Sequence, residues 1–447
     1  GAIDSVLYSN VFEGLTRFGP DGSINPGLAT SWDVSEDGKV YTFHLAEGVT
    51  FHDGTTMDAE DVVFSLDRAR ADDSVNAQKA LFAGIESVEA TDPLTVTVTL
   101  KTADGNFPFN MAWGDAVIVA PESVETIKTA PIGTGAFKFD NWVQGDSIHL
   151  VKNADYWGEP AILDEATFKF ISDPTAAFAA MMAEDLDVFV AFPAPENLPQ
   201  FDADPRFKVL IGSTEGETIL AINNKLPPFD NVKVREAIAH AVNRQEIIDG
   251  AMFGYGTPIG THFAPHHPDY VDLTEMSGYD PEKSKALLAE AGVATPLKVK
   301  MTLPPPSYAR RGGEIVAAEL RAVGIEPEIE NVEWAQWLEG TFKGKDYGLT
   351  IISHTEPLDI NIYARPDYYF QYDNPEFQAL MTDLSAESDP AKRSEMFKQA
   401  QEIIAKDYVN AYLFQLPLHT VAKVGVEGLW ENLPTQATDL TAVSWSQ

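Results

Sequence analysis

Between residues 219 and 352, short β-type runs alternate with longer helical runs, and this order restricts the fold more than any other feature of the chain. The predicted strands are residues 219–223, 297–303, 325–329 and 347–352. Amphipathic runs stand between them, and glycine or proline marks several junctions. Strands that alternate with helices predict a parallel or mixed sheet covered by helices.

The helical runs have recognisable ends. Residues 232–251 are predicted as one helix, with Val234, Ile238 and Val242 on one face. The run YDPEKSKALLAEAG at 279–292 has a capped start and a terminal glycine. Further helices are predicted at 308–323, 334–340 and 389–408, and strands at 410–416 and 420–424.

Residues 40–69, VYTFHLAEGVTFHDGTTMDAEDVVFSLDRA, combine several short elements. Alternation predicts a strand at 40–45, and two glycine turns flank a second short strand at 49–52. Acidic residues after Thr56 and the late Arg68 and Arg70 complement the dipole of a helix. No nucleophile–base pair, phosphate loop or metal cluster occurs here, so we interpret the stretch as a packing unit.

Composition narrows the possible functions. With 447 residues, 44% of them hydrophobic, the chain is long enough for more than one domain. A net charge of −37 repels nucleic acid and anionic lipid, so binding to either is not expected. We interpret this charge as one that keeps the protein soluble in a salty environment. Cysteine is absent, which suits an exported bacterial protein and also many cytosolic ones. No leader pattern begins at residue 1, so we expect that any export signal has been removed.

Five further blocks occur in a fixed order: VFEGL with PGLATSWDVSEDG (11–38), PIGTGAFKF (131–139), NADYWG (153–158), PPFDNVKVREAIAHAVNR (227–244) and the 279–292 run. With residues 40–69, they resemble the extracytoplasmic solute-binding proteins of family 5, which serve ABC importers of peptides, nickel and opines. The first strand usual in that family, with its leucine–aspartate–proline turn, is not found ahead of residue 1.

The resemblance implies an α/β fold, a two-lobed periplasmic-binding-protein clamp with an additional inserted β-rich domain. Domain I would comprise residues 1–32, 131–221 and 425–447, domain II residues 33–130, and domain III residues 222–424. The chain would cross between the lobes near Asn223 and Lys423. Binding would be a hinge closure around a buried solute, and the membrane permease would recognise the closed form.

The resemblance also indicates where a peptide would bind. In dipeptide- and oligopeptide-binding relatives, an aspartate three residues before an acid–proline pair holds the ammonium of the peptide. The pair here is Glu356-Pro357, which puts Ser353 at the position of the aspartate. Either Glu356 or Asp359 replaces the anchor at a shifted position, or the ligand has no free ammonium there.

The same segment follows a predicted strand, where ligands of α/β folds bind. Arg365 could hold a carboxylate bidentately, and the tyrosines offer flat faces and hydroxyls. The alternative is a surface loop with salt bridges and a partly buried aromatic pair. The candidate ligand-binding residues of this segment are His354, Glu356, Asp359, Arg365, Tyr368 and Tyr369.

Four candidates lie elsewhere. Arg310 and Arg311 precede two glycines at a helix start and either receive an anionic group or compensate nearby acids. Trp334, spaced i,i+3 from Trp337, is a candidate ligand platform whose alternative role is core packing. Trp113, in NMAWGD, is expected to face the cleft from domain II.

We expect no metal site, no cofactor and no enzymatic activity. His262, His266 and His267 lie in HFAPHHP, where adjacent histidines before a proline are poorly spaced for a metal. The glycines of GYGTPIG do not open a helix in a βαβ unit, as a dinucleotide site requires. A peptidase would need a nucleophile–base–orienter set, and the sequence does not indicate one.

The predicted function is the substrate-binding component of an ABC importer, a periplasmic monomer that delivers a small peptide or peptide-like solute with an anionic group to the permease. Alternative solutes are an opine, a sugar-phosphate conjugate, an oligosaccharide or a nickel chelate. A sensor as partner instead of a transporter, a lipid tether, and a peptidase are further alternatives.

Overall fold

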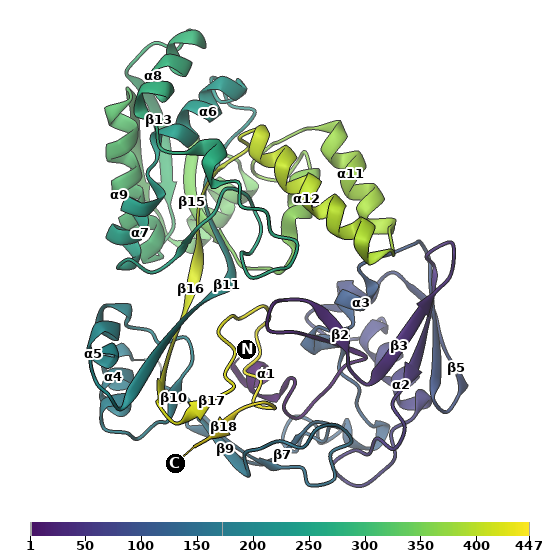
Figure 1. The fold of residues 1–447 in the computed structure, drawn as a ribbon. Helices are drawn as coiled ribbons and strands as arrows, with labels where there is room; N and C mark the ends of the chain where they lie inside the picture. Colours follow the sequence, from purple (N-terminus) through teal and green to yellow (C-terminus); the bar gives the residue numbers. More distant parts are fainter. Residues whose placement is uncertain (1, 172, 447) are drawn as a thin grey trace. The chain divides into compact units, whose positions relative to one another are not determined.

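The computed structural model describes residues 2–171 and 173–446, and the chain divides into two compact units. Unit 1 comprises Gly1–Leu210, Ser385–Pro390 and His419–Gln447, and unit 2 comprises Ile211–Leu384 and Ala391–Leu418. Two long strands, β11 (Phe207–Ile222) and β16 (Ala411–Lys423), contain residues of both units (Figure 1). The three-domain division drawn from the resemblance stays a prediction.

Unit 1 is built from small antiparallel sheets. In its four-stranded sheet β4 (Val40–Leu45) pairs with β3 (Ala29–Val34) and β6 (Thr95–Leu100), and β5 (Ile85–Asp92) pairs with β6. Alternate residues of β4 are buried, as the sequence pattern predicted. The other elements of unit 1 are α1 (Ala2–Leu7), β1 (Thr16–Phe18), β2 (Ile24–Pro26), α2 (Ala59–Arg70), α3 (Phe107–Asn110), β7 (Phe137–Val143), β8 (Ser147–Lys152), β9 (Glu165–Lys169), α4 (Pro174–Met182), β10 (Val188–Phe189), α5 (Leu198–Asp202), β17 (Val426–Glu427) and β18 (Ser444–Trp445).

Helix α2 confirms the helix predicted after Thr56, but the second strand predicted at 49–52 is wrong. Thr50 makes only an isolated bridge to Thr56, and the chain between them forms a turn in which Asp53 accepts from the backbone N–H of Thr55 at 2.9 Å. A turn this tight leaves no room for a strand pair. Asp58 then caps α2 through a capping box.

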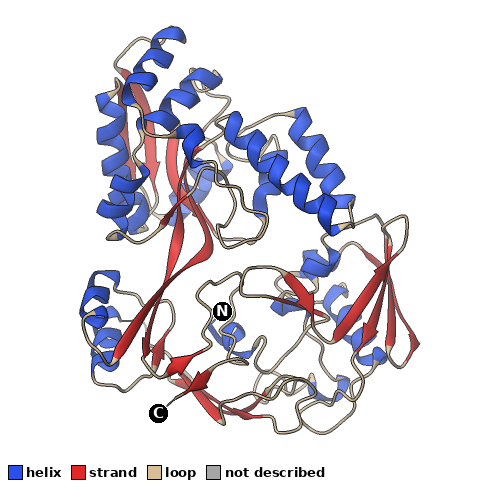
Figure 2. Ribbon diagram, in the orientation of Figure 1, coloured by secondary structure: helices blue, strands red, loops and turns tan. Residues whose placement is uncertain are grey.

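Unit 2 contains a mixed sheet, as predicted from the alternating strands and helices. β11 pairs antiparallel with β15 (Leu349–His354), whereas β13 (Leu297–Leu303) runs parallel to β15 and to β14 (Ile325–Asn331). Figure 2 shows the helices that pack beside these strands. The remaining elements are α6 (Val232–Ala241), α7 (Arg244–Met252), β12 (Thr257–Pro258), α8 (Pro281–Glu290), α9 (Ser307–Ala322), α10 (Trp334–Gln336), α11 (Pro375–Ala386) and α12 (Pro390–Lys406).

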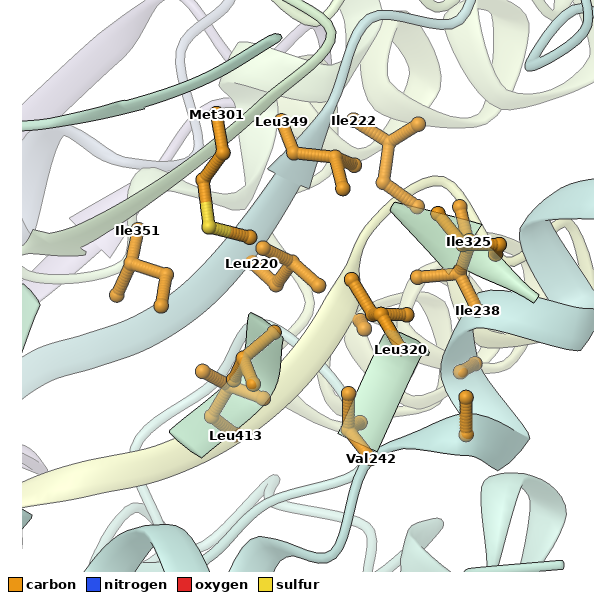
Figure 3. Packing of buried hydrophobic residues seen from close by; sticks show 14 of the residues in the cluster. Leu220, Ile222, Ile238, Val242, Met301, Leu320, Ile325, Leu349, Ile351 and Leu413 are labelled. Carbon is orange, nitrogen blue, oxygen red and sulfur yellow. The ribbon is translucent and has the colours of Figure 1, made fainter. Parts of the chain in front are cut away.

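The core of unit 2 lies between this sheet and its helices. Leu220 and Ile351 of adjacent strands pack with Leu320 of α9 and Val242 (Figure 3). All four side chains are buried, so they remove apolar surface from water at about 25 cal/mol per Å². Leu220 and Ile351 are cross-strand partners, so this packing supports the register of β11 and β15.

Two predicted boundaries are corrected, and one helix was missed. The helix expected at 232–251 is two helices, because Val242 is extended and the side chain of Asn243 caps the second helix. The strands predicted at 410–416 and 420–424 are one strand, β16. Helix α11 was not predicted from the sequence. No helix among the described residues is both long enough and apolar enough to span a membrane.

Candidate functional site

A buried polar layer lies where β15 ends in unit 2. His354, the last residue of β15, is the cross-strand partner of Glu217 on β11, so the two side chains share one face of the sheet. The chain then turns into a 3₁₀ helix, Asp359–Ala364, which brings Asp359 beside His354. The layer, which we call the acid–histidine layer, consists of Glu215, Glu217, His262, His266, His354 and Asp359.

The carboxylate of Asp359 lies between two imidazoles. Its Oδ1 is 2.8 Å from Nε2 of His262, and its Oδ2 is 3.5 Å from Nδ1 of His354. The hydroxyls of Tyr363 and Tyr369 lie 3.1 Å and 3.0 Å from the other ring nitrogens. Both tyrosines are fully buried, which raises the pKa of each hydroxyl well above its usual value, so both hydroxyls keep their protons and are able to donate to these nitrogens.

Charge is distributed unequally between these groups. Burial alone would raise the pKa of Asp359, but its contacts with His262 and His354 outweigh burial and hold this pKa well below its usual range. Burial lowers the pKa of His262, against the attraction of Asp359. At neutral pH Asp359 is therefore an anion that accepts hydrogen bonds from a neutral imidazole.

A second hydrogen-bonded series lies in the same layer. Oγ of Ser213 is 2.6 Å from Nδ1 of His266, and Nε2 of His266 is 2.6 Å from Oε1 of Glu215. Ser213 and Glu215 are two residues apart on β11, so both face His266. Burial raises the pKa of Glu215, and the hydrogen bond with His266 opposes this rise.

Glu217 is the member of the layer with an unused acceptor. Its side chain is almost fully buried, and its Oε2 has no hydrogen-bond partner among the described residues. Burial raises the pKa of Glu217 well above the usual value, and the negative charges of Asp359 and Glu215 add to this rise. Its carboxyl group therefore keeps its proton at pH values where an exposed glutamate is ionised.

The structure brings four of the predicted site residues together: His354, Asp359, Tyr368 and Tyr369. Tyr369 is 1% exposed and its ring stacks on that of His354 with centroids 6.0 Å apart. The exposed Arg365 lies over the ring of Tyr368, with 4.5 Å from its guanidinium carbon to the centroid. Glu356 is exposed and lies outside this group, where its carboxylate accepts from the N–H of Thr355 at 3.3 Å.

The other predicted residues lie apart from the acid–histidine layer. Arg310 donates to the carbonyl of Val332 at 3.1 Å and to Glu333 at 3.3 Å. Arg311 lies over the ring of Phe253 at 5.2 Å. Trp334 is 42% exposed and packs edge-on against Trp337. Trp113 belongs to unit 1, where its buried Nε1 has no hydrogen-bond partner among the described residues.

Ser353 faces away from the acid–histidine layer. It is the cross-strand partner of Thr218, one position along from the Glu217–His354 pair, so its side chain lies on the opposite face of the sheet. Its backbone N–H donates to the hydroxyl of Tyr308 at 3.2 Å. The hydroxyls of Ser353 and Thr218 are buried and have no partner among the described side chains and backbone groups.

Sequence reasoning missed Glu215, Glu217 and the convergence of distant histidines. The three histidines of HFAPHHP take different partners: His262 lies with His354 and Asp359, His266 with Glu215, and His267 against the ring of Phe263. The only available signal was a strand pattern with two acids spaced i,i+2 before the apolar run TILAI. One ligand atom each of His262, His354 and Asp359 lies within 4.8 Å of the others, so this trio could hold a metal ion.

Comparison with known proteins identifies the family. Residues 23–373 match the family described as bacterial extracellular solute-binding proteins, family 5 Middle. The match covers most of the chain, so the chain belongs to this family, as its sequence blocks predicted. The members of this family are substrate-binding proteins located outside the cytoplasm.

Individual relatives agree with this assignment. The chain is 29% identical over 430 residues to heme-binding protein A of Haemophilus influenzae, and this alignment covers 85% of this chain and 77% of that protein. It is 29% identical over 425 residues to the dipeptide-binding protein of Escherichia coli, and this alignment covers 85% of this chain and 78% of the relative.

Solved structures show the same fold. The structure of HbpA2 from Haemophilus parasuis matches with a TM-score of 0.89 at 25% identity and covers 98% of this chain and 94% of that one. DppA from Helicobacter pylori, solved in complex with the peptide STSA, matches with a TM-score of 0.73 at 26% identity and covers 98% and 93%. The predicted clamp fold of periplasmic binding proteins is confirmed.

Proposed function

We propose that the solute which this substrate-binding protein delivers to its ABC permease is a small peptide or peptide-like molecule that carries an anionic group. We further propose that capture takes place in the periplasm by a monomer, through the hinge closure expected from the family. Membership of family 5 and the dipeptide-binding relative of Escherichia coli support this proposal.

The observation that carries the proposal is the unused carboxyl oxygen of Glu217. A buried acceptor without a donor costs stability unless a ligand supplies the donor. The ammonium of a peptide has hydrogen-bond donors and a positive charge, and both favour the ionised form of Glu217. Glu217 would thus take the role of the aspartate that is absent at Ser353, from the opposite face of the sheet.

We propose that the protein binds its solute without catalysis. Ser213, His266 and Glu215 have the residue types of a hydrolytic triad, but their order on the imidazole is reversed. In serine hydrolases Nε2 faces the serine and Nδ1 faces the acid, whereas here Nδ1 faces Ser213 and Nε2 faces Glu215. Peptide that is recovered intact after long incubation with the protein supports binding alone, and cleavage products would contradict it.

One further solute class has support from the structure. The atoms of His262, His354 and Asp359 that lie within 4.8 Å of one another could ligate the metal of a nickel chelate. Imidazole and carboxylate suit nickel, and the hydroxyls of Tyr363 and Tyr369 would orient the two rings from behind. This candidate predicts that nickel alone raises the unfolding temperature.

Thermal unfolding against a panel of solutes tests the proposal. The panel contains di- to pentapeptides, their N-acetylated forms, opines, sugar phosphates, oligosaccharides and nickel with and without chelators. A solute at about 100 times its Kd adds roughly 2.7 kcal/mol to the free energy of unfolding. A rise with free peptides that weakens on N-acetylation supports the proposal. A rise only with nickel or with a non-peptide solute would refute the peptide assignment.

The variant Glu217→Gln tests whether Glu217 binds the ammonium of the peptide. It should lose most of the response to free peptides, because the amide cannot pair with an ammonium charge. Glu326→Gln is the matched control, since Glu326 is an exposed residue on β14 of the same sheet. If both variants respond to peptides like the parent, Glu217 is not the ammonium anchor.

A further inference from the structure

The interior of unit 2 holds three side chains of the kinds that ligate a transition-metal ion, His262, His354 and Asp359, which we call the metal trio. One ligand atom of each lies within 4.8 Å of the other two. Asp359 reaches both rings, with Oδ1 2.8 Å from Nε2 of His262 and Oδ2 3.5 Å from Nδ1 of His354. Two ligand atoms on a tetrahedral zinc ion lie roughly 3.3 Å apart. The spacing of the trio is therefore close to that of a metal site.

The second ring nitrogen of each histidine has a neighbour of the kind found in metal sites. A histidine that binds a metal through one nitrogen carries a proton on the other and donates it to a nearby acceptor. Nδ1 of His262 lies 3.1 Å from the hydroxyl of Tyr363, and Nε2 of His354 lies 3.0 Å from the hydroxyl of Tyr369. A hydroxyl oxygen accepts as well as donates, so both tyrosines can hold the rings in the orientation that a metal needs.

Glu217 is placed to supply a fourth ligand atom. It is the cross-strand partner of His354, so its side chain lies on the face of the sheet that carries the trio. The negative charge of Asp359 contributes to the raised pKa of Glu217, so the two carboxyl groups lie close together. Oε2 of Glu217 is buried and has no hydrogen-bond partner among the described residues. A buried acceptor of this kind gains a partner when a cation binds beside it.

Charge balance also favours a divalent ion at this position. The carboxylates of Asp359 and Glu217 carry two negative charges, which balance the two positive charges of the ion, while the imidazoles bind as neutral groups. The occupied site is thus neutral, and burial penalises a neutral site far less than an unpaired charge. The side chain of Asp359 is 12% exposed and that of His262 only 1%, so an ion reaches the site from the side of Asp359.

We propose that the metal trio and Glu217 bind a free divalent transition-metal ion, and that this ion competes with the ammonium of the solute for Glu217. The competition rests on the proposed function, in which Oε2 of Glu217 receives that ammonium. An oxygen that ligates a metal ion cannot also accept from an ammonium, and the ion repels the ammonium charge. By linkage, the solute weakens metal binding by the same factor. A nickel chelate, in contrast, would itself be the solute.

Calorimetric titration with zinc chloride and then with Ala-Ala-Phe tests the inference. An excess of magnesium in the buffer occupies exposed carboxylates, because magnesium prefers oxygen ligands. We expect the parent to bind one zinc ion per chain. Zinc at about 100 times its Kd should raise the apparent Kd of Ala-Ala-Phe about a hundredfold, as mass action requires when two ligands exclude each other.

Three variants show where zinc binds. His262→Gln and Glu217→Gln should each lower the affinity for zinc at least tenfold, because each removes a ligand atom. Glu217→Gln decides the question if His262→Gln fails to fold, since glutamine nearly matches the shape of glutamate. His149→Gln is the matched control and should bind zinc like the parent. His149 lies 2.9 Å from Asp140 and 3.5 Å from Glu165, in a more exposed group of the same residue types.

A parent that binds no zinc under these conditions would overturn the inference. Equal zinc affinity of Glu217→Gln and the parent would overturn it too, and so would loss of zinc binding in His149→Gln. An unchanged Kd of Ala-Ala-Phe at saturating zinc would overturn the competition. If the parent binds no peptide in the absence of zinc, the proposed function fails and the competition fails with it, whereas the zinc titrations of the variants still decide the metal site.

Discussion

Replacing Glu217 by glutamine should change how the stability of the unliganded protein depends on pH. Burial raises the pKa of Glu217 well above its usual value, and Asp359 and Glu215 raise it further. In the unfolded chain the same carboxyl titrates near pH 4.3. Between these two pKa values the folded state holds a proton that the unfolded state has released, so the free energy of unfolding falls as pH rises.

The magnitude follows from the pKa difference. Each pH unit between the unfolded and the folded pKa removes about 1.4 kcal/mol from the stability of the parent. Glutamine has nearly the same shape and no proton to lose, so Glu217→Gln should not show this decline. Its amide still lacks a partner for one polar atom, which adds an offset of about 1–3 kcal/mol that does not vary with pH.

Urea unfolding followed by tryptophan fluorescence from pH 4 to pH 8 measures both the pH-dependent loss of stability in the parent and the constant offset in the variant. The difference in free energy of unfolding between Glu217→Gln and the parent should increase with pH in favour of the variant. Glu326→Gln, on the exposed side of β14, should follow the parent at every pH. A difference between Glu217→Gln and the parent that stays constant over this range would refute the reasoning that Glu217 is protonated in the folded state.

Three further predictions concern the solute. Arg365→Ala should weaken solute binding by about tenfold. It should cost less than about 1 kcal/mol of stability, because an exposed cation–π contact with Tyr368 contributes only that much. Equal affinity of variant and parent in titration would show that Arg365 is not part of the site. Ser353→Asp should leave the preference for a peptide with a free ammonium over its N-acetylated form unchanged, because the side chain at 353 lies on the face of the sheet opposite Glu217; an increased preference would place the ammonium at Ser353, as the alignment predicts, and not at Glu217. Saturating solute should reduce the radius of gyration in small-angle scattering, whereas an unchanged radius would contradict hinge closure.

Much of the local structure was predictable because short-range forces decide it. The alternation of β4 and the acidic first turn of α2 were both visible in the sequence, and so was the order of strands and helices in unit 2. The sequence blocks also predicted the family and the fold, which the comparisons confirm. The local errors are the strand predicted at 49–52, the missed helix α11, and helix boundaries such as Asn243, which begins a new helix where the hydrophobic pattern continues.

The candidate sites could be predicted only in part. The segment after β15 was expected to carry ligand-binding side chains, and the structure places His354, Asp359, Tyr368 and Tyr369 together. Their partners on β11 and in HFAPHHP lie about 90 to 140 positions earlier in the chain. Pairing between these segments is a long-range contact, which no local periodicity encodes.

The sequence by itself therefore determined the fold class, the family and the segment in which to search, because these depend on local patterns and on blocks of residues in a fixed order. Only the tertiary structure decided which ionisable groups are buried and how their pKa values are shifted. Glu217 is an ordinary acid in the sequence, and burial between β15 and β16 raises its pKa. The histidines of HFAPHHP are close together in the sequence, yet in the fold His262 lies with Asp359 and His266 with Glu215. Burial and pairing depend on segments that are distant in the sequence and adjacent in the fold. Burial and pairing in turn set the pKa values of the groups in the acid–histidine layer.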